Sequence, residues 1–131
     1  MTGHPAATRV LLVDDQPQFR RAAAALIATT PGLELVGEAG SGERAVDLVS
    51  ELAPDLIVMD VTLPGIDGIE ACRRILRVRP DLRIVLVSTY DRADLPGIDG
   101  CGAARFVRKQ DFDGPALLGR PTLRPPGPVE G

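Results

Sequence analysis

The sequence predicts an α/β fold in which helices cover both faces of a single, doubly wound, five-stranded parallel sheet. Short apolar runs rich in Val, Ile and Leu alternate along the chain with amphipathic stretches, and such runs are typical of strands buried on both faces. The 131 residues suffice for one domain with a buried core. Hydrophobic residues make up 44% of the chain and aromatic residues 3%, so we expect an aliphatic core.

The first half of the sheet begins with a strand over residues 9–13 (RVLLV), which ends at Asp14 and Asp15. Pro17 favours the start of a helix, because the first helical position needs no backbone N–H. The inner face of this helix carries four apolar residues at helical spacing: Phe19, Ala23, Leu26 and Ile27. Residues 33–38 alternate partly between apolar and polar side chains, which indicates a strand at the edge of the sheet.

The middle of the chain repeats this order of helix and strand. A second helix is predicted by four apolar residues at spacings of three and four: Ala45, Leu48, Val49 and Leu52. Pro54 ends it, and the apolar strand 55–59 (DLIVM) then leads to Asp60. Asp67 is a suitable N-cap for a third helix. The inner face of that helix carries Ile69, Cys72 and Leu76.

The last third of the chain predicts two strands and two weak helices. The strands cover 82–87 and 104–107, and Lys109 follows the second of them. A fourth helix would fall on DRADLPGIDGCGAA, where Pro and Gly oppose it, and a fifth on the short segment DFDGPALLG. We therefore expect an N-terminal tail over 1–8, one domain over 9–119, and a Pro-rich tail over 120–131.

Charge and composition exclude several classes of protein. The net charge of −3 is of the wrong sign for a nucleic-acid-binding surface. Cys72 and Cys101 lack metal-ligand spacing and are expected to be free thiols in a reducing compartment. The apolar runs are too short to span a bilayer, and the N-terminus has no signal-peptide core. We expect a cytoplasmic protein without a membrane partner.

Polar residues follow four of the five predicted strands. Asp14 and Asp15 come after the first strand, Asp60 after the third, Ser88 after the fourth and Lys109 after the fifth. Because ligands of such folds bind at the carboxyl ends of the strands, these side chains should meet in one cleft. Three carboxylates in one cleft repel one another unless a cation lies among them, and oxygen ligands suit Mg²⁺.

Four motifs in this order, VDDQP, MDVTLPGIDG, VST and FVRK, resemble those of the receiver domains of two-component response regulators. The resemblance covers roughly residues 9–111. It implies a flavodoxin-like fold with strand order 2-1-3-4-5 and a phosphoacceptor signalling domain that catalyses only its own phosphorylation and dephosphorylation. It also implies a sensor histidine kinase or a phosphotransfer protein as donor, and it leaves the downstream partner and homodimerisation open.

The resemblance implies roles for individual residues. Asp60 would be the phosphoacceptor, and Lys109 would pair with the phosphoryl group. Mg²⁺ would be held by Asp14, Asp15, Asp60 and the backbone carbonyl of Thr62. Ser88 and Phe106 would form the switch that responds to the phosphoryl group. Thr62 and Tyr90 would line the path of the hydrolytic water, and the bulk of Tyr90 predicts slow loss of phosphate.

One departure from the family concerns the end of the domain, where Gln110 replaces a frequent Pro after the Lys. This feature and VDDQPQFRRAAAALI resemble the subfamily that precedes a helix-turn-helix output domain. No such domain follows in this sequence, so we expect no DNA binding by the chain. The broken fourth and fifth helical segments keep open an alternative function, a receiver-like interaction module that works without phosphate.

A remote alternative is a nucleotide-binding Rossmann-like domain. The segment from Gly40 to Ala45 fits the pattern G-x-G-x-x-A between a strand and a helix. That pattern belongs in the first turn between strand and helix, where this chain instead carries Asp14 and Asp15. Two carboxylates there would repel a pyrophosphate.

Overall fold

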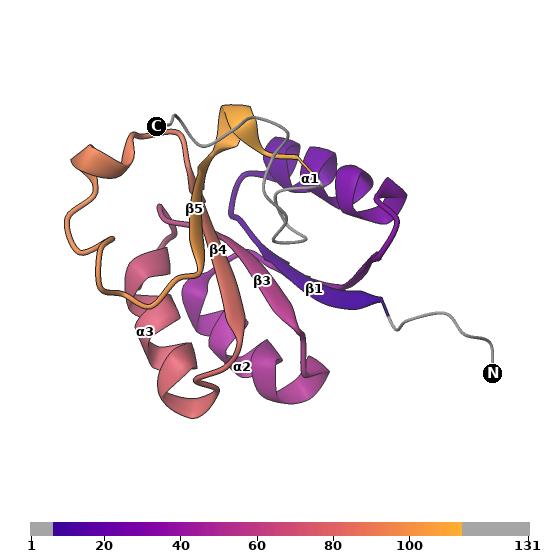
Figure 1. The fold of residues 1–131 in the computed structure, drawn as a ribbon, viewed down its shortest axis with the longest axis horizontal. Helices are drawn as coiled ribbons and strands as arrows, with labels where there is room; N and C mark the ends of the chain where they lie inside the picture. Colours follow the sequence, from indigo (N-terminus) through magenta and orange to yellow (C-terminus); the bar gives the residue numbers. More distant parts are fainter. Residues whose placement is uncertain (1–6, 114–131) are drawn as a thin grey trace, which may run out of the picture.

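The computed structural model describes residues 7–113, in which five parallel strands form one sheet in the order β2-β1-β3-β4-β5. The strands are β1 (Thr8–Val13), β2 (Leu33–Ala39), β3 (Leu56–Asp60), β4 (Arg83–Ser88) and β5 (Arg105–Arg108). The helices are α1 (Pro17–Thr29), α2 (Gly42–Leu52) and α3 (Gly68–Val78). Figure 1 shows α1 on one face of the sheet and α2 and α3 on the other. The predicted fold class and strand order are confirmed.

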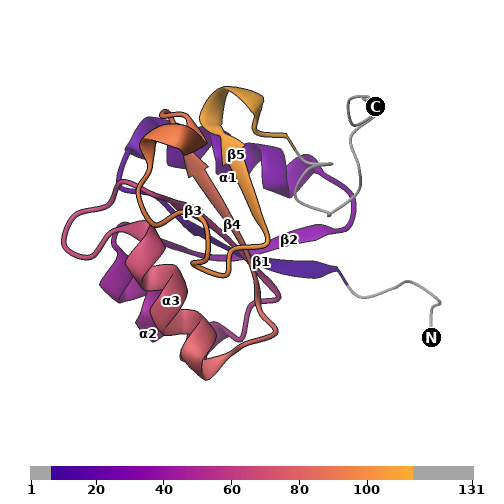
Figure 2. The ribbon, with the colours of Figure 1, turned by 60° about the vertical axis from the view of Figure 1, so that its left-hand side comes forward.

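The core consists of two layers, one on each face of the sheet. Neighbouring residues of a strand point to opposite faces, so in β1 the side chain of Leu12 packs under α1 while that of Leu11 packs under α2 and α3. Both side chains are completely buried. On the first face Ala23 and Ile27 of α1 complete the layer. Figure 2 shows α2 and α3 side by side over the second face, which has the larger layer.

Local signals set the ends of the helices. Pro17 opens α1, as predicted. Ser41 caps α2 by accepting a hydrogen bond from the backbone N–H of Arg44, and Asp67 caps α3 by accepting one from the N–H of Glu70 at 2.8 Å. The third strand differs from its predicted bounds: it starts after Asp55, whose carboxylate accepts a hydrogen bond from the N–H of Arg9.

The segment between β4 and β5 contains no α-helix, which confirms the predicted weakness of the fourth helix. A single 3₁₀ turn, η1 (Arg92–Asp94), lies there, and Gly97, Gly100 and Gly102 have positive φ angles that glycine adopts without strain. The segment nevertheless closes the core, since the side chains of Ile98 and Cys101 are buried against the layer under α3. A second 3₁₀ turn, η2 (Lys109–Asp111), follows β5. Most of the predicted fifth helix and all of the predicted Pro-rich tail (120–131) lie outside the described residues.

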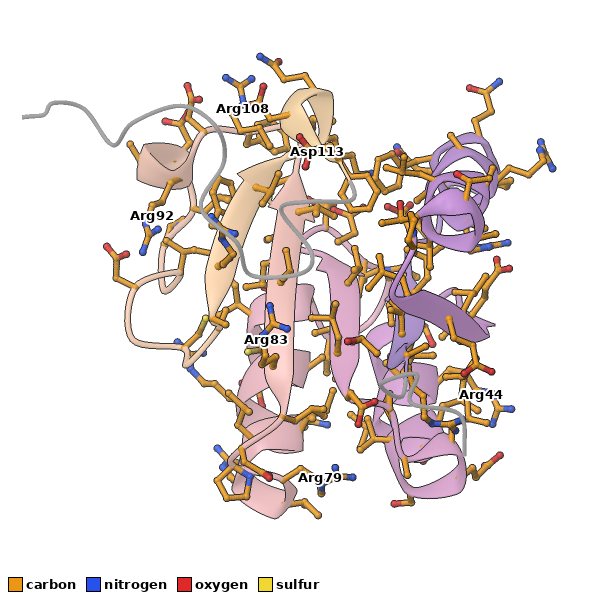
Figure 3. The ribbon with its side chains drawn as sticks, turned by 45° about the vertical axis from the view of Figure 1, so that its right-hand side comes forward. Arg44, Arg79, Arg83, Arg92, Arg108 and Asp113 are labelled. Carbon is orange, nitrogen blue, oxygen red and sulfur yellow. The ribbon has the colours of Figure 1, made fainter. Side chains whose placement is uncertain are left out.

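The surface charges are distributed around the molecule. Figure 3 labels Arg44 on α2, Arg79 at the end of α3, Arg92 in η1 and Arg108 at the end of β5. Arg92 pairs with Asp99 at 2.6 Å, and Arg108 pairs with Asp91 at 2.8 Å. Both cysteines are free, as predicted, and both are buried. Within residues 7–113, no helix has the length and apolar character needed to cross a bilayer.

Candidate functional site

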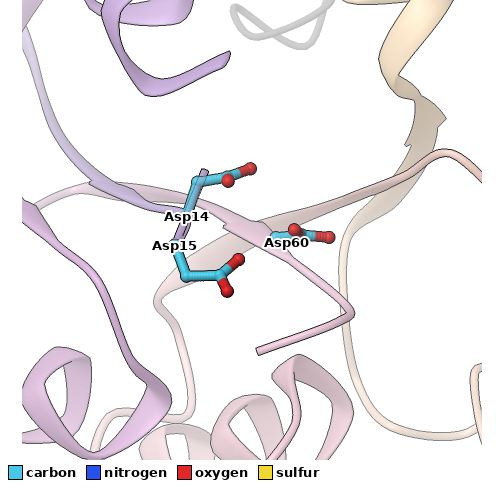
Figure 4. A group of neighbouring side chains, drawn as sticks. All are labelled: Asp14, Asp15 and Asp60. Carbon is cyan, nitrogen blue, oxygen red and sulfur yellow. The ribbon is translucent and has the colours of Figure 1, made fainter. Parts of the chain in front are cut away.

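Three carboxylates meet at the carboxyl ends of β1 and β3. Asp14 and Asp15 directly follow β1, and Asp60 is the last residue of the neighbouring strand β3. Figure 4 shows the three side chains gathered at this edge of the sheet. One oxygen from each lies within 4.8 Å of the others. Asp14 is fully buried and Asp60 nearly so, while Asp15 is exposed. The parallel sheet thus brings together the acidic residues that the sequence singled out.

Lys109 supplies the positive charge of this cluster. It follows β5, at the far side of the sheet, and its side chain reaches back over the strand ends to the acids. The Nζ atom lies 2.8 Å from Asp14 Oδ2 and 3.2 Å from Asp60 Oδ2, with the side chain only 10% exposed. It also donates a hydrogen bond to Gln16 Oε1 at 3.0 Å. A buried ammonium paired with two carboxylates partly balances their charge.

The two buried carboxylates have different environments. Burial raises the pKa of Asp60 above its ordinary value; the hydrogen bond from the N–H of Thr62 lowers it, the charge of Asp14 raises it, and Lys109 lowers it. The Thr62 N–H donates to Asp60 Oδ1 at 3.1 Å. Asp14 Oδ1 accepts a hydrogen bond from the N–H of Gln16 at 2.7 Å. Apart from its ion pair with Lys109, Asp14 Oδ2 has no partner among the described residues.

This donor set fits a hard divalent cation. Asp14 Oδ2 is a buried carboxylate oxygen without a hydrogen bond, and oxygens of Asp15 and Asp60 lie close to Asp14. Clustered carboxylates are the ligands with which proteins hold Mg²⁺, together with retained water. The exposed position of Asp15 leaves a side of the cluster open to solvent.

A pocket of about 160 Å³ opens beside the carboxylates. It is lined by Asp15, Gln16, Asp60, Thr62, Thr89, Tyr90 and Lys109. This space is several times what one water molecule needs, so it has room for a phosphoryl-sized group. The sequence predicted five of these seven residues. It missed Gln16 and Thr89, although each directly follows a residue that was predicted, Asp15 and Ser88 respectively.

The two predicted switch residues lie outside this pocket's lining. Ser88 is fully buried at the end of β4, and its Oγ accepts a hydrogen bond from the N–H of Tyr90 at 2.9 Å. Phe106 lies half-buried in β5, packs against the core layer under α3, and lines a separate cavity of about 60 Å³ together with Arg92 and Ile98.

The glycine-rich turn before α2 serves packing between elements. A Cβ atom on Gly42 would lie 2.8 Å from Ile66 Cγ1 and 3.0 Å from the Ile66 carbonyl oxygen, so glycine permits this close approach. Glu43, in the first turn of α2, accepts a hydrogen bond from the N–H of Ile66 at 3.2 Å. The start of α2 is therefore covered by a loop and a carboxylate, an arrangement that opposes binding of a pyrophosphate.

Comparison with known proteins identifies the class of this chain. The family model of the response regulator receiver domain matches residues 10–118, and the chain belongs to this family. It is a receiver domain of the kind found in two-component signalling proteins.

Two relatives and a complex illustrate the similarity. The response regulator GacA of Pseudomonas aeruginosa is 39% identical over 102 residues, which are 77% of this chain and 48% of that protein. The chain thus spans about half the length of this curated relative. The receiver domain of NarL from Mycobacterium tuberculosis superposes with a TM-score of 0.75 at 30% identity, covering 82% of this chain and 88% of that domain. A CheX-CheY-BeF3-Mg²⁺ complex from Borrelia burgdorferi contains a chain with a TM-score of 0.72 at 27% identity, covering 90% and 87%.

Proposed function

We propose that this domain accepts a phosphoryl group on Asp60 from a phosphohistidine of a sensor kinase or phosphotransfer protein, in the presence of Mg²⁺. The observation that carries the proposal is the cluster of Asp14, Asp15 and Asp60 within 4.8 Å, with the Lys109 ammonium 3.2 Å from Asp60. A nucleophilic carboxylate, a cation site and a fixed positive charge are the groups that phosphoryl transfer needs.

Asp60 acts as the nucleophile in this proposal. One of its carboxylate oxygens forms a bond to phosphorus while the bond between phosphorus and the donor nitrogen breaks, and the released imidazole takes up a proton. The Thr62 N–H donates to Asp60 Oδ1, which leaves Oδ2 on the side of Lys109. Lys109 then pairs with the phosphoryl oxygens, which bring roughly −1.5 to −2 of charge.

The carboxylates of Asp14, Asp15 and Asp60 and the backbone carbonyl of Thr62 would hold Mg²⁺. When bound, the ion supplies positive charge that offsets the charge of the carboxylates and of the phosphoryl oxygens. The related complex from Borrelia burgdorferi, which includes BeF3 and Mg²⁺, supports this assignment by similarity. Asp15 keeps the site accessible, because it is exposed beside the two buried acids.

Ser88 and Phe106 would transmit the change. For the Ser88 hydroxyl to hydrogen-bond a phosphoryl oxygen, it must leave the N–H of Tyr90, and Phe106 would turn inward with it. Such a rearrangement converts a local charge event into a changed surface at β4 and β5. The surface so changed would be read by a downstream partner.

Intact-mass measurement after incubation with phosphoramidate and Mg²⁺ tests the proposal. We expect the wild-type chain to gain one phosphoryl group and Asp60→Asn to gain none. Asp47→Asn is the matched control, because it makes the same change on the exposed face of α2. Failure of the wild type to gain mass, or an undiminished gain by Asp60→Asn, contradicts the proposal. Equal binding of a partner by wild type and Asp60→Ala would instead support a module that works without phosphate.

A further inference from the structure

Two residues at the start of α1, Gln16 directly before the helix and Phe19 in its first turn, contact the ammonium group of Lys109. Gln16 Oε1 accepts a hydrogen bond from Nζ at 3.0 Å, and the centre of the Phe19 ring lies 4.4 Å from Nζ, within the range of a cation–π interaction. Gln16 precedes α1 with an extended backbone and Phe19 lies three residues further on, and the side chains of both reach the same ammonium. The start of α1 therefore forms a second set of partners for Lys109, opposite the acids.

Other contacts fix the orientation of these two residues. The backbone N–H of Gln16 donates to Asp14 Oδ1 at 2.7 Å, which holds the start of α1 against the acidic cluster. The ring of Phe112 meets the ring of Phe19 edge to face, with the centres 5.5 Å apart and the planes at 65°. Phe112 lies three residues after Lys109, and Phe19 lies three residues after Gln16. The segments 16–19 and 109–112 therefore meet through their phenylalanine rings beside the ammonium.

The Lys109 ammonium has three oxygen partners: Asp14 Oδ2 in an ion pair, and Asp60 Oδ2 and Gln16 Oε1 in hydrogen bonds. A divalent cation held by the carboxylates competes with the ammonium for the same Asp oxygens, and the two positive charges repel each other. Gln16 and Phe19 are uncharged partners that contact the ammonium while it also contacts Asp14 and Asp60. They would remain beside the ammonium once a cation takes the carboxylate oxygens.

We infer that Gln16 and Phe19 are positioning residues that hold the Lys109 ammonium beside the acidic cluster while a divalent cation occupies it. The inference rests on the proposed function, since it assumes that the cluster binds Mg²⁺. Without Gln16 and Phe19, the ammonium would be less stable once it has moved away from Asp14 and Asp60. It would therefore remain more often on these two carboxylates. Mg²⁺ would then bind more weakly, although none of its proposed ligands has changed.

Calorimetric titration of the whole chain with Mg²⁺ alone measures this effect. From a solvent-exposed hydrogen bond of ordinary net strength, we expect Gln16→Ala to weaken Mg²⁺ binding about three- to tenfold. From the loss of the cation–π contact, we expect Phe19→Leu to weaken it about two- to fivefold. Phe19→Tyr retains the aromatic face and should restore wild-type affinity.

Gln18→Ala is the matched control, because it removes the same side chain from an exposed position two residues away. Gln16 provides no side-chain cap to α1, so Ala at this position retains the helix. Thermal unfolding without Mg²⁺ checks that Phe19→Leu is folded at the titration temperature. A merely structural role for Phe19 would lower the melting temperature and leave the Mg²⁺ affinity unchanged.

The results separate this inference from the function on which it rests. Wild-type affinity in both Gln16→Ala and Phe19→Leu overturns the positioning role while leaving the metal site intact. Absence of Mg²⁺ binding by the wild type itself overturns the proposed metal site, and the inference with it. Weakened binding in both variants, with Gln18→Ala and Phe19→Tyr unaffected, is the result we expect.

Discussion

The close contact between the start of α3 and β3, the strand that ends in the proposed phosphoacceptor, makes Gly68 a sensitive position. Its backbone N–H donates to the carbonyl of Val61 at 2.8 Å, so the helix begins directly against the residues that end β3. A Cβ atom at Gly68 would overlap the carbonyl oxygen of Asp60, and it would lie 2.9 Å from Val61 Cα, where ordinary contacts are 3.4–4 Å. These are backbone atoms, which cannot turn aside as a flexible side chain does.

Gly68→Ala should therefore destabilise the domain. In an open helical position this substitution stabilises a protein by up to about 1 kcal/mol. Here it requires α3 or the backbone at Asp60 to move by about half an ångström or more, and overpacking of this kind costs about 1–3 kcal/mol. We expect the overpacking to dominate, with a net loss of about 2 kcal/mol and a fall in melting temperature of about 8 °C.

Urea unfolding followed by circular dichroism measures the loss, and Gly40→Ala is the control. A Cβ atom at Gly40 would meet only Arg20 Nη1, at an ordinary 3.7 Å, so that variant should unfold like the wild type. The displaced backbone should also slow phosphorylation of Asp60 in variant molecules that remain folded. A Gly68→Ala variant that is as stable as the wild type would refute the packing argument.

Three further predictions concern the acidic cluster, the buried thiols and the lifetime of the phosphoryl group. Mg²⁺ at ten times its dissociation constant should stabilise the wild type by about 1.4 kcal/mol, and Asp15→Asn should abolish most of this gain; an equal rise in melting temperature for both proteins would contradict it. Burial raises the pKa of the Cys72 thiol to about 12. This thiol should therefore react with a disulfide reagent at pH 8 only after the protein is unfolded in urea, and rapid labelling of Cys72 in the native protein would contradict this prediction. Tyr90 lines the pocket with its side chain 57% exposed; Tyr90→Ala should speed loss of phosphate severalfold, and an unchanged decay of phosphoprotein would exclude that role.

The sequence predicted those parts of the fold that depend on local patterns. Apolar runs and the residues that follow them located every strand to within a residue or two, and Asp67 correctly marked the start of α3. The positions of Asp14, Asp15 and Asp60 at neighbouring strand ends followed from parallel pairing. The hydrogen bond between Gln16 and Lys109 was not accessible in this way, because no local pattern relates two individual side chains that are 93 residues apart.

The rest depended on three-dimensional packing. Pro and Gly indicated that the segment after β4 forms no long helix, but the pattern did not reveal that Ile98 and Cys101 enter the core from it. Ser88 was expected to respond to the phosphoryl group, and in this structure its Oγ accepts a hydrogen bond from the N–H of Tyr90. A side chain that is proposed to change partners has no single position that a sequence pattern can predict.

The most direct test of the central claim is a crystal structure of the chain with Mg²⁺ and beryllofluoride, a mimic of the phosphoryl group. We predict beryllium bonded to a carboxylate oxygen of Asp60, Mg²⁺ among Asp14, Asp15 and Asp60, and Lys109 Nζ moved from Asp14 Oδ2 to a fluorine atom. Two results at saturating concentrations of both ions would contradict the account. One is a structure without beryllofluoride on Asp60. The other is a structure in which Lys109 still pairs with Asp14 and no cation lies among the carboxylates.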